Sequence, residues 1–242
     1  YLGIAATDGI VGLSPGSGIP PAFIETNFSD SPVCLQEVTL LPDDAEASEW
    51  AGSADTASFE VRRDGLMMDD LTVLYSTGGT AVAVTDFTES GGVGSVVIPS
   101  GTDTVTVVVT AVADSQAEGD ETVIPTLVPD AAYTLGEPDT TTLTIHDPPL
   151  DNWRFAHFGP GNPTGSDDPD DPDVDGMENL LEYALGLDPN LSDSAMAPLT
   201  HGLGTVGGAE SLTLTYPRNL DHFDIIYTIE TSTTLLLSLI HI

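Results

Sequence analysis

Between residues 38 and 147, apolar and polar residues alternate in short runs, and glycine- and proline-rich turn signals separate the runs. Alternation with a period of two places apolar side chains on one face of an extended strand. Seven such runs in about 110 residues predict a mainly β fold, a seven-strand antiparallel sandwich. The predicted strands are Val38–Leu41, Ala57–Arg62, Leu71–Ser76, Gly94–Ile98, Thr104–Val112, Glu121–Val128 and Thr140–Ile145.

Pro125 lies inside the sixth of these runs. Because proline lacks a backbone N–H, it removes one hydrogen bond from a β-ladder. We therefore expect the strand that contains Pro125 to lie at a sheet edge or to carry a bulge there.

The flanking segments have other patterns. Residues 1–37 are rich in glycine and proline, which is typical of a linker or of the end of a preceding module. Glu210–Tyr216 and Asp224–Thr231 alternate again and predict a hairpin, part of an incomplete β module over residues 191–242. The chain is interpreted as a fragment of a longer protein. Its last residues, Leu235–Ile242, break abruptly from the alternation, which leaves a non-native origin open.

Charge is the extreme property of the composition. The chain has 39 acidic and 4 basic residues, a formal net charge of −35. Such a charge repels nucleic acid and anionic membranes, so both are excluded as partners. No apolar run is long enough for membrane insertion within these residues. Like charges also oppose the compact state unless cations bind or salt screens them. Cys34 is the only cysteine, so no disulfide forms within the chain.

One acidic stretch, Asp171–Glu182 (DPDVDGMENLLE), has the spacing D-x-D-x-D-G-x5-E of an EF-hand calcium loop. A calcium ion needs six to eight oxygen ligands, and a short loop supplies them when alternate side chains point inward. Gly176 permits the sharp turn, because glycine accepts positive φ. The alternative is a solvated acidic linker. The predicted calcium ligands are Asp171, Asp173, Asp175, the Met177 carbonyl, Asn179 (directly or through water) and Glu182.

Helices are predicted on both sides of this loop, giving an EF-hand-like segment over residues 149–190. Asp151–Phe158 is expected to form the first helix, with Asp151 as its cap. Met177–Leu185 is expected to form the second, ending at Gly186. The segment resembles the single EF-hand-like or dockerin-like repeat of secreted bacterial proteins. A dockerin has two calcium loops and this segment has one, so we expect an unpaired, weakly binding loop.

Residues 38–147 resemble a Calx-beta domain. The resemblance rests on DDAEASE at Asp43, FEVRRDG at Phe59, the stretch from Leu71 to Phe87, ADSQAEGDETV at Ala113 and LTIHD at Leu143. It implies an immunoglobulin-like sandwich over residues 38–148 that binds calcium at one tip. By this resemblance, the calcium-site carboxylates are Glu49, Asp86, Asp114, Glu118, Glu121 and Asp147.

The acidic pairs that accompany multi-ion sites in this family are reduced here to Ala113-Asp114 and to Asp147 followed by two prolines. One or two calcium ions are therefore expected at the tip. The alternative is a sandwich that has lost calcium binding and keeps acidic loops for solubility.

No Ser–His–Asp, phosphate-loop or HExxH pattern occurs, so no catalytic residues and no enzyme activity are expected. The sequence predicts a calcium-binding structural or adhesion module of a secreted or cell-surface protein. Its partners would be calcium ions and a cell-surface protein or polysaccharide. The alternative is a non-catalytic accessory region of a secreted hydrolase whose catalytic domain lies outside these residues.

Overall fold

A computed structural model describes residues 36–50, 55–65, 67–92, 94–193, 199–229 and 240–241. The chain divides into two compact units, Tyr1–Cys34 and Leu35–Ile242. The first unit, and with it nearly all of the predicted linker over residues 1–37, lies outside the described residues. Within the described ranges, no helix combines the length and the apolar character needed to span a membrane.

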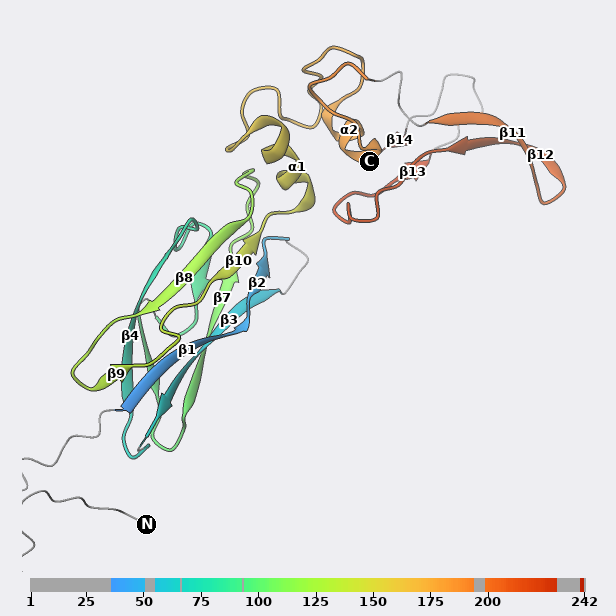
Figure 1. The fold of residues 1–242 in the computed structure, drawn as a ribbon. Helices are drawn as coiled ribbons and strands as arrows, with labels where there is room; N and C mark the ends of the chain where they lie inside the picture. Colours follow the sequence, from blue (N-terminus) through green and yellow to red (C-terminus); the bar gives the residue numbers. More distant parts are fainter. Residues whose placement is uncertain are drawn as a thin grey trace, which may run out of the picture. The chain divides into compact units, whose positions relative to one another are not determined.

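The fold is mainly β, and two five-stranded sheets face each other (Figure 1). The first sheet has the strand order β5-β7-β3-β1-β9 and the second has the order β2-β10-β8-β4-β6. In chain order the strands are β1 (Gln36–Asp44), β2 (Glu46–Ser48), β3 (Thr56–Asp64), β4 (Leu71–Gly79), β5 (Phe87–Glu89), β6 (Ser95–Ile98), β7 (Thr104–Ala111), β8 (Glu121–Leu127), β9 (Tyr133–Leu135) and β10 (Leu143–His146).

The prediction of seven antiparallel strands needs two corrections. The seven predicted runs correspond to β1, β3, β4, β6, β7, β8 and β10, and three further strands of three residues each, β2, β5 and β9, complete the sheets. Two of the pairings, β1 with β9 and β10 with β2, are parallel. A three-residue strand is too short to show a recognisable alternation, and pairing direction leaves no mark on the periodicity of one strand.

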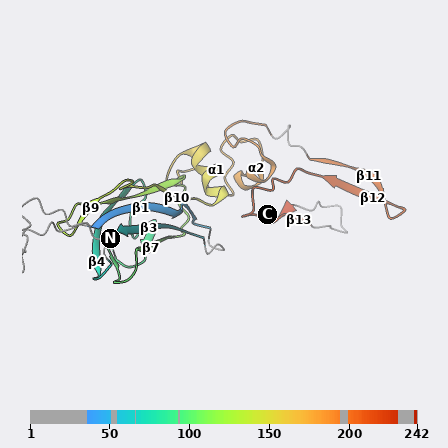
Figure 2. The ribbon, with the colours of Figure 1, turned by 60° about the horizontal axis from the view of Figure 1, so that its bottom comes forward.

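The buried core lies between the sheets. In β1 the side chains of Val38 and Leu40 are fully buried, as the alternation requires. Phe59 of β3 meets Tyr75 of β4 edge to face, with ring centroids 5.5 Å apart. Figure 2 shows β1, β3 and β7 side by side in the first sheet.

The chain passes from one sheet to the other between β1 and β2. β1 pairs with β3 in the first sheet, and the ladder shifts register between Pro42 and Asp44. After Ala45, β2 pairs with β10 in the second sheet. This switch carries the chain directly to the tip at which β10 ends.

Neither alternative expected from sequence is found: Pro125 does not lie in an edge strand, and no register shift interrupts the pairing of β4 with β8 around it. Its strand β8 lies between β10 and β4. Pro125 pairs with Thr77 of β4 on one side. On the other side the ladder of β10 with β8 covers only Glu121–Val123, and beyond it the Thr141 N–H donates to the Pro125 carbonyl at 3.2 Å. A residue without a backbone N–H is accommodated there because the regular ladder has ended and Pro125 only accepts a hydrogen bond on that side.

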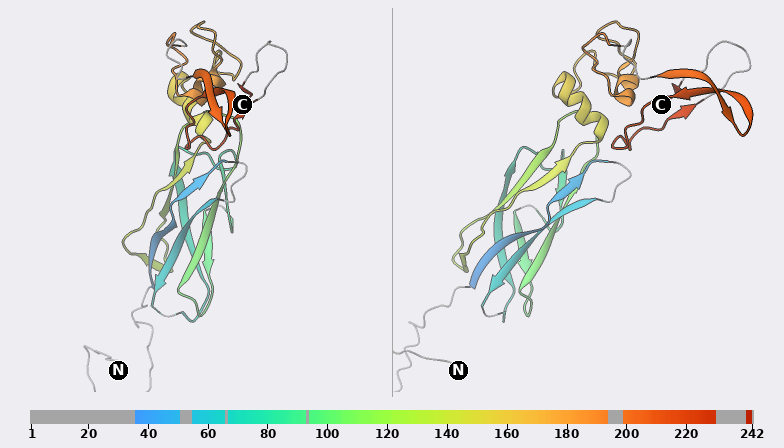
Figure 3. Two further views of the ribbon diagram at one scale, coloured as in Figure 1. Left: turned by 90° about the vertical axis from the view of Figure 1, so that its right-hand side faces the viewer. Right: turned by 45° about the vertical axis from the view of Figure 1, so that its right-hand side comes forward.

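After β10 the chain forms the helices α1 (Pro149–Phe158) and α2 (Asn179–Leu185), then β11 (Thr200–Val206), β12 (Ala209–Thr215), β13 (Thr228–Ile229) and β14 (Ile240–His241) (Figure 3). The predicted C-terminal hairpin is wrong in its pairing. β12 covers most of Glu210–Tyr216, but it pairs with β11, and β13 pairs with β14. Most of Leu235–Ile242 lies outside the described residues.

Candidate metal centres

Glu49 and Asp147 lie together because the two strands that precede them are parallel. β2 and β10 run side by side and end at Ser48 and His146, which are paired. The next residue of each chain segment therefore leaves the sheet at the same tip, and the Glu49 N–H donates to the His146 carbonyl at 2.9 Å. Both carboxylates are almost fully buried, with 3% of Glu49 and 5% of Asp147 exposed.

The four other predicted carboxylates reach the same tip from neighbouring strand ends. Glu121 opens β8, which is antiparallel to β10. Asp86 precedes β5, whose first residue pairs with the last residue of β7. Asp114 and Glu118 lie in the loop from β7 to β8. Carboxylate oxygens of Glu49, Glu118 and Glu121 all lie within 4.8 Å of one another. The six residues predicted from the family resemblance thus lie at one tip.

Burial and mutual repulsion raise the pKa values of several of these carboxylates. Burial, together with the charges of Asp147, Asp114, Glu118 and Asp86, raises the pKa of Glu49 to about 8. Burial also raises the pKa of Asp147 to about 6, against the lowering effect of two backbone hydrogen bonds. The pKa of Glu118 and that of Glu121 are raised by burial and then by Asp86. Two unit charges about 5 Å apart repel by roughly 3–4 kcal/mol at an effective dielectric constant near 20.

The hydrogen bonding of this tip fits a divalent cation. Asp86 Oδ1 and Glu121 Oε2 are buried, and no donor for either is found in the described part of the chain. Asp86 Oδ2 accepts the Val82 N–H at 2.6 Å, and Asp147 Oδ2 accepts two backbone N–H groups. Backbone donors thus fix one oxygen of each of these aspartates. Buried carboxylate oxygens without donors are costly unless a proton or a cation satisfies them. Oxygen atoms from carboxylates are the ligands that calcium prefers.

The predicted calcium loop forms a second acidic centre. Oxygens of Asp171, Asp173 and Asp175 lie within 4.8 Å of one another. These three side chains are partly buried, whereas Pro172 and Val174 between them are exposed, so alternate side chains point inward as predicted. Gly176 has φ of 92°, the turn expected at the sixth place. Its N–H donates to Asp171 Oδ2 at 3.0 Å.

The last three predicted ligands differ in what the structure shows of them. Glu182 is fully buried, and neither carboxylate oxygen has a hydrogen-bond partner among the described residues. Burial and then the charges of Asp173, Asp175 and Asp193 raise the pKa of Glu182 to about 7. The Asn179 amide donates to the carbonyls of Gly165 and Asp167, and its Oδ1 is buried without a donor in the described ranges. The Met177 N–H donates to Asp175 Oδ1 at 3.0 Å.

Both helices predicted around the loop are present, with shifted starts: α1 begins at Pro149, two residues earlier than predicted, and ends at Phe158 as predicted. Turns and bends occupy the chain between Phe158 and the loop at Asp171, so α1 does not lead directly into the loop. α2 begins at Asn179, two residues later than predicted, and ends at Gly186 in the left-handed conformation, as predicted. α1 has Pro148 as its cap, and Asp151 lies in its first turn, where it pairs with Arg154 at 2.6 Å. Arg154 also pairs with Asp168 and so connects α1 to the segment before the loop.

Asp193 was missed by the sequence analysis. Oxygens of Asp175, Glu182 and Asp193 lie within 4.8 Å of one another, and Asp193 is only 7% exposed. The only sequence signal is a further aspartate beyond the Gly186 turn, in NLSD. The EF-hand spacing ends at Glu182, so that template gives no reason to select it.

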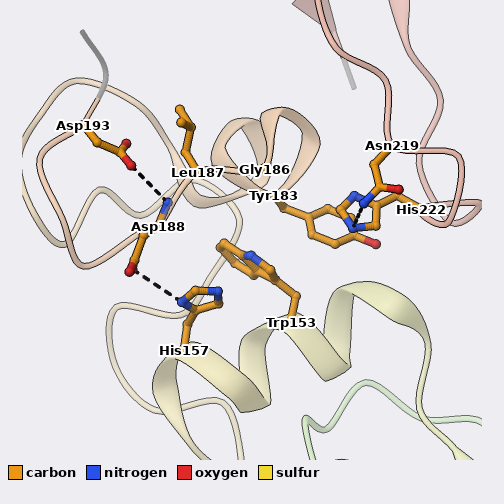
Figure 4. Close-up of a pocket in the computed structure, with 9 residues that line it drawn as sticks. All are labelled: Trp153, His157, Tyr183, Gly186, Leu187, Asp188, Asp193, Asn219 and His222. Carbon is orange, nitrogen blue, oxygen red and sulfur yellow. Dashed lines mark hydrogen bonds and ion pairs between the residues drawn. The ribbon is translucent and has the colours of Figure 1, made fainter. Parts of the chain in front are cut away.

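A cavity of about 390 Å³ adjoins this centre, and Asp193 is one of its lining residues (Figure 4). Trp153 and His157 of α1 form one side, with ring centroids 4.9 Å apart. Tyr183 of α2 stacks on His222, with ring centroids 3.8 Å apart. Asp193 therefore belongs both to the second acidic centre and to the lining of the cavity between α1, α2 and the chain beyond Gly186.

Comparison with solved structures finds calcium-binding domains of Calx as neighbours. The apo form of the Calx CBD1 domain is 26% identical, with 47% of this chain and 97% of that chain covered and a TM-score of 0.39. The calcium binding domain CBD12 of CALX1.1 is 27% identical, with 45% of this chain and 44% of that chain covered and a TM-score of 0.36. CBD12 from CALX1.2 is 25% identical, with 46% of this chain and 45% of that chain covered and a TM-score of 0.36.

The chain therefore spans less than half of each of the two CBD12 structures. No family model matches the chain, and no curated protein matches it. At these TM-scores the structural likeness carries no information on the function of this chain.

Proposed function

We propose that this chain is a calcium-dependent structural module, in which calcium binds the sandwich tip and the loop at Asp171–Glu182. The observation that carries the proposal is the set of buried carboxylates at the tip. Glu49, Asp86 and Asp147 are each at least nine-tenths buried, and further carboxylates lie within reach of them. All four arginines lie within the described residues, and none forms an ion pair with these carboxylates.

The proposed role of calcium is thermodynamic. A ligand that binds only the folded state adds about 2.7 kcal/mol of stability at a concentration one hundred times its dissociation constant. At the tip, calcium would replace repulsion between carboxylates with attraction, and so fix the loops that leave β2, β7 and β10. In a chain of net charge −35, this gain decides how rigid the module is.

The location and partners are also part of the proposal. An unpaired, partly exposed loop binds calcium weakly, on the order of 10⁻⁴–10⁻³ M, which suits extracellular fluid. We infer a secreted or cell-surface protein in which the stiffened module serves adhesion to a cell-surface protein or polysaccharide, without catalysis. The coding sequence on either side tests this role. Further sandwich repeats of this kind support adhesion, whereas a catalytic motif supports the accessory region of a secreted hydrolase.

Calorimetric calcium titration of the full chain at low salt tests the calcium sites. We expect Glu118→Ala and Asp175→Ala each to remove a separate part of the binding heat. Asp64→Ala is the matched control, because it removes one exposed charge from the end of β3 distant from the tip. The proposal is wrong if the first two variants bind calcium with the heat and affinity of the wild type.

A further inference from the structure

The second acidic centre contains a carboxylate from outside the twelve-residue loop, that of Asp193. Asp193 lies past the end of α2, yet it is buried against Asp175 and Glu182. Its backbone N–H donates to Asp175 Oδ2 at 2.9 Å. The loop and the segment after α2 are therefore already joined through the backbone of Asp193.

The buried carboxylates of this centre indicate that it binds a ligand. Both oxygens of Glu182 and the Oδ1 atom of Asp193 are buried and have no hydrogen-bond donor among the described residues. Glu182 is fully buried and Asp193 is more than nine-tenths buried. Leaving a buried acceptor unsatisfied costs about 1–3 kcal/mol, and more when the group is charged. A cation between the two carboxylates would satisfy all three oxygens at once.

We propose that Asp193 is an additional ligand of the divalent cation held by Asp175 and Glu182, and that this cation fastens the segment Leu187–Asp193 to the loop. The proposal rests on calcium binding by the loop, as inferred above, and extends it by one ligand and one structural consequence. A calcium ion takes six to eight oxygens, so a further carboxylate fits its coordination. The added negative charge should raise the affinity above that of the loop alone.

The structural consequence follows from contacts of the same segment (Figure 4). Asp193 Oδ2 accepts the Asp188 N–H at 3.5 Å, and Asp188 Oδ1 lies 3.4 Å from His157 Nδ1 on α1. Leu187 and Asp188 also line the cavity beside Trp153. A cation at Asp193 would therefore hold this wall of the cavity in place and connect the loop to α1.

The test compares Asp193→Asn with Asp188→Asn in the full chain, using calcium as the only added ligand. Each variant removes one charge from the same segment, but only Asp193 belongs to the acidic centre. We expect Asp193→Asn to weaken the loop site at least about tenfold, the lower end of what loss of even an outer-shell partner costs. Asp188→Asn should bind as the wild type does. Calcium should slow hydrogen exchange over Leu187–Asp193 in the wild type and in Asp188→Asn, but not in Asp193→Asn.

Thermal unfolding separates a ligand from a residue that only supports the fold. Without calcium, Asp193→Asn should melt at or above the wild-type temperature, because it removes a charge that repels Glu182. With calcium it should melt below the wild type. Lower melting in both conditions, or wild-type affinity while Asp175→Ala loses binding heat, would overturn the role of Asp193 and leave the proposed function intact. Full binding heat in Asp175→Ala would overturn both.

Discussion

Asp147 is joined to Gly119 across two loops of the sandwich by a hydrogen bond of 2.8 Å from the Gly119 N–H to Asp147 Oδ2. The N–H of the neighbouring Glu118 donates to the same oxygen at 3.0 Å. One oxygen of Asp147 thus orders the turn before β8, on which Glu118 lies. The tip is held in shape by neutral donors, which leaves its carboxylates close together whether or not a cation is bound.

Asp147 accepts two backbone hydrogen bonds and is a proposed calcium ligand, and substitutions can separate these two roles. In calcium-free solution, Asp147→Ala should lower the free energy of unfolding by about 1–3 kcal/mol, because two backbone N–H groups lose their acceptor. Asp147→Asn keeps an acceptor oxygen and removes a charge that repels Glu49, so its calcium-free stability should equal or exceed that of the wild type. Both variants should lose stabilisation by calcium at the tip. Urea unfolding with and without calcium measures this, and full calcium stabilisation of Asp147→Asn would contradict the assignment.

The stability of the calcium-free protein should depend on pH in a definite direction. In the folded state the pKa of Glu49 is raised from 4.5 to about 8, and that of Asp147 from 3.8 to about 6. The folded state therefore binds these protons more tightly than the unfolded state does. Their contribution to stability is fully present below about pH 4 and is lost as the pH rises through about 6 and then about 8.

The melting temperature of the calcium-free protein should therefore decrease as the pH is raised from 5 to 8.5. The protein for this measurement is prepared without chelator. Calcium competes with these protons, so calcium affinity should rise over the same interval, and saturating calcium should flatten the fall. Glu49→Gln is the control, because it removes the group that titrates highest and should remove the part of the fall above pH 7. A calcium-free stability that rises from pH 5 to pH 8.5 would contradict the raised pKa values.

The sequence allowed the long strands to be predicted because each has enough residues to show period-two burial. In β1, for example, Val38 and Leu40 are buried as the alternation indicates. Glu46–Ser48 is too short for that signal, although it places Glu49 at the tip. Alternation also identifies a strand without its partner, which is why Glu210–Tyr216 was assigned to the wrong hairpin. Its partner, Thr200–Val206, contains two glycines and shows little alternation.

The two acidic centres were predictable to different extents. Asp171, Asp173 and Asp175 lie within one short loop, so spacing alone indicated that they converge. Glu49 and Asp147 are distant in sequence, and only the resemblance to a known family indicated that they meet. Asp193 has neither kind of signal, because its position depends on how the chain returns after α2. Long-range convergence is a property of topology, which local pattern does not encode.

The opposite end of the sandwich depends on a buried cation. Arg63, at the end of β3, is fully buried and donates to the carbonyls of Thr102, Asp69 and Pro99 at 2.8–2.9 Å. Arg63→Met should lower the free energy of unfolding by about 1–3 kcal/mol, because the carbonyls of Thr102 and Asp69 lose a donor, whereas that of Pro99 keeps the N–H and hydroxyl of Thr102. Arg62→Met is the matched control: Arg62 is exposed, and its loss should change stability by about 0.5 kcal/mol or less.

Chemical unfolding measures both arginine variants, and calcium titration should give wild-type affinity for each, because Arg63 and the tip lie at opposite ends of β3. Unfolding of Arg63→Met at the wild-type midpoint would show that the carbonyls are satisfied in another way.

Gly119 links the tip to α1, and its substitution should affect calcium binding as well as stability. Its φ is +77°, and an added Cβ would lie 2.9 Å from the Phe155 ring of α1. Gly119→Ala should cost about 1–2 kcal/mol through the left-handed conformation and should shift the N–H that holds Asp147. Gly91→Ala is the matched control, because Gly91 has φ of +95° with nothing within 4 Å of its Cβ.

In calcium-free solution Gly91→Ala should lose only the conformational part of the stability and Gly119→Ala at least as much, and only Gly119→Ala should bind calcium more weakly at the tip. Since Phe155 is 38% exposed, its ring has room to move, and Phe155→Ala combined with Gly119→Ala measures how much of the loss is steric. If Gly119→Ala and Gly91→Ala have the same calcium affinity in titration calorimetry, the hydrogen bond from Gly119 to Asp147 is not needed to form the site.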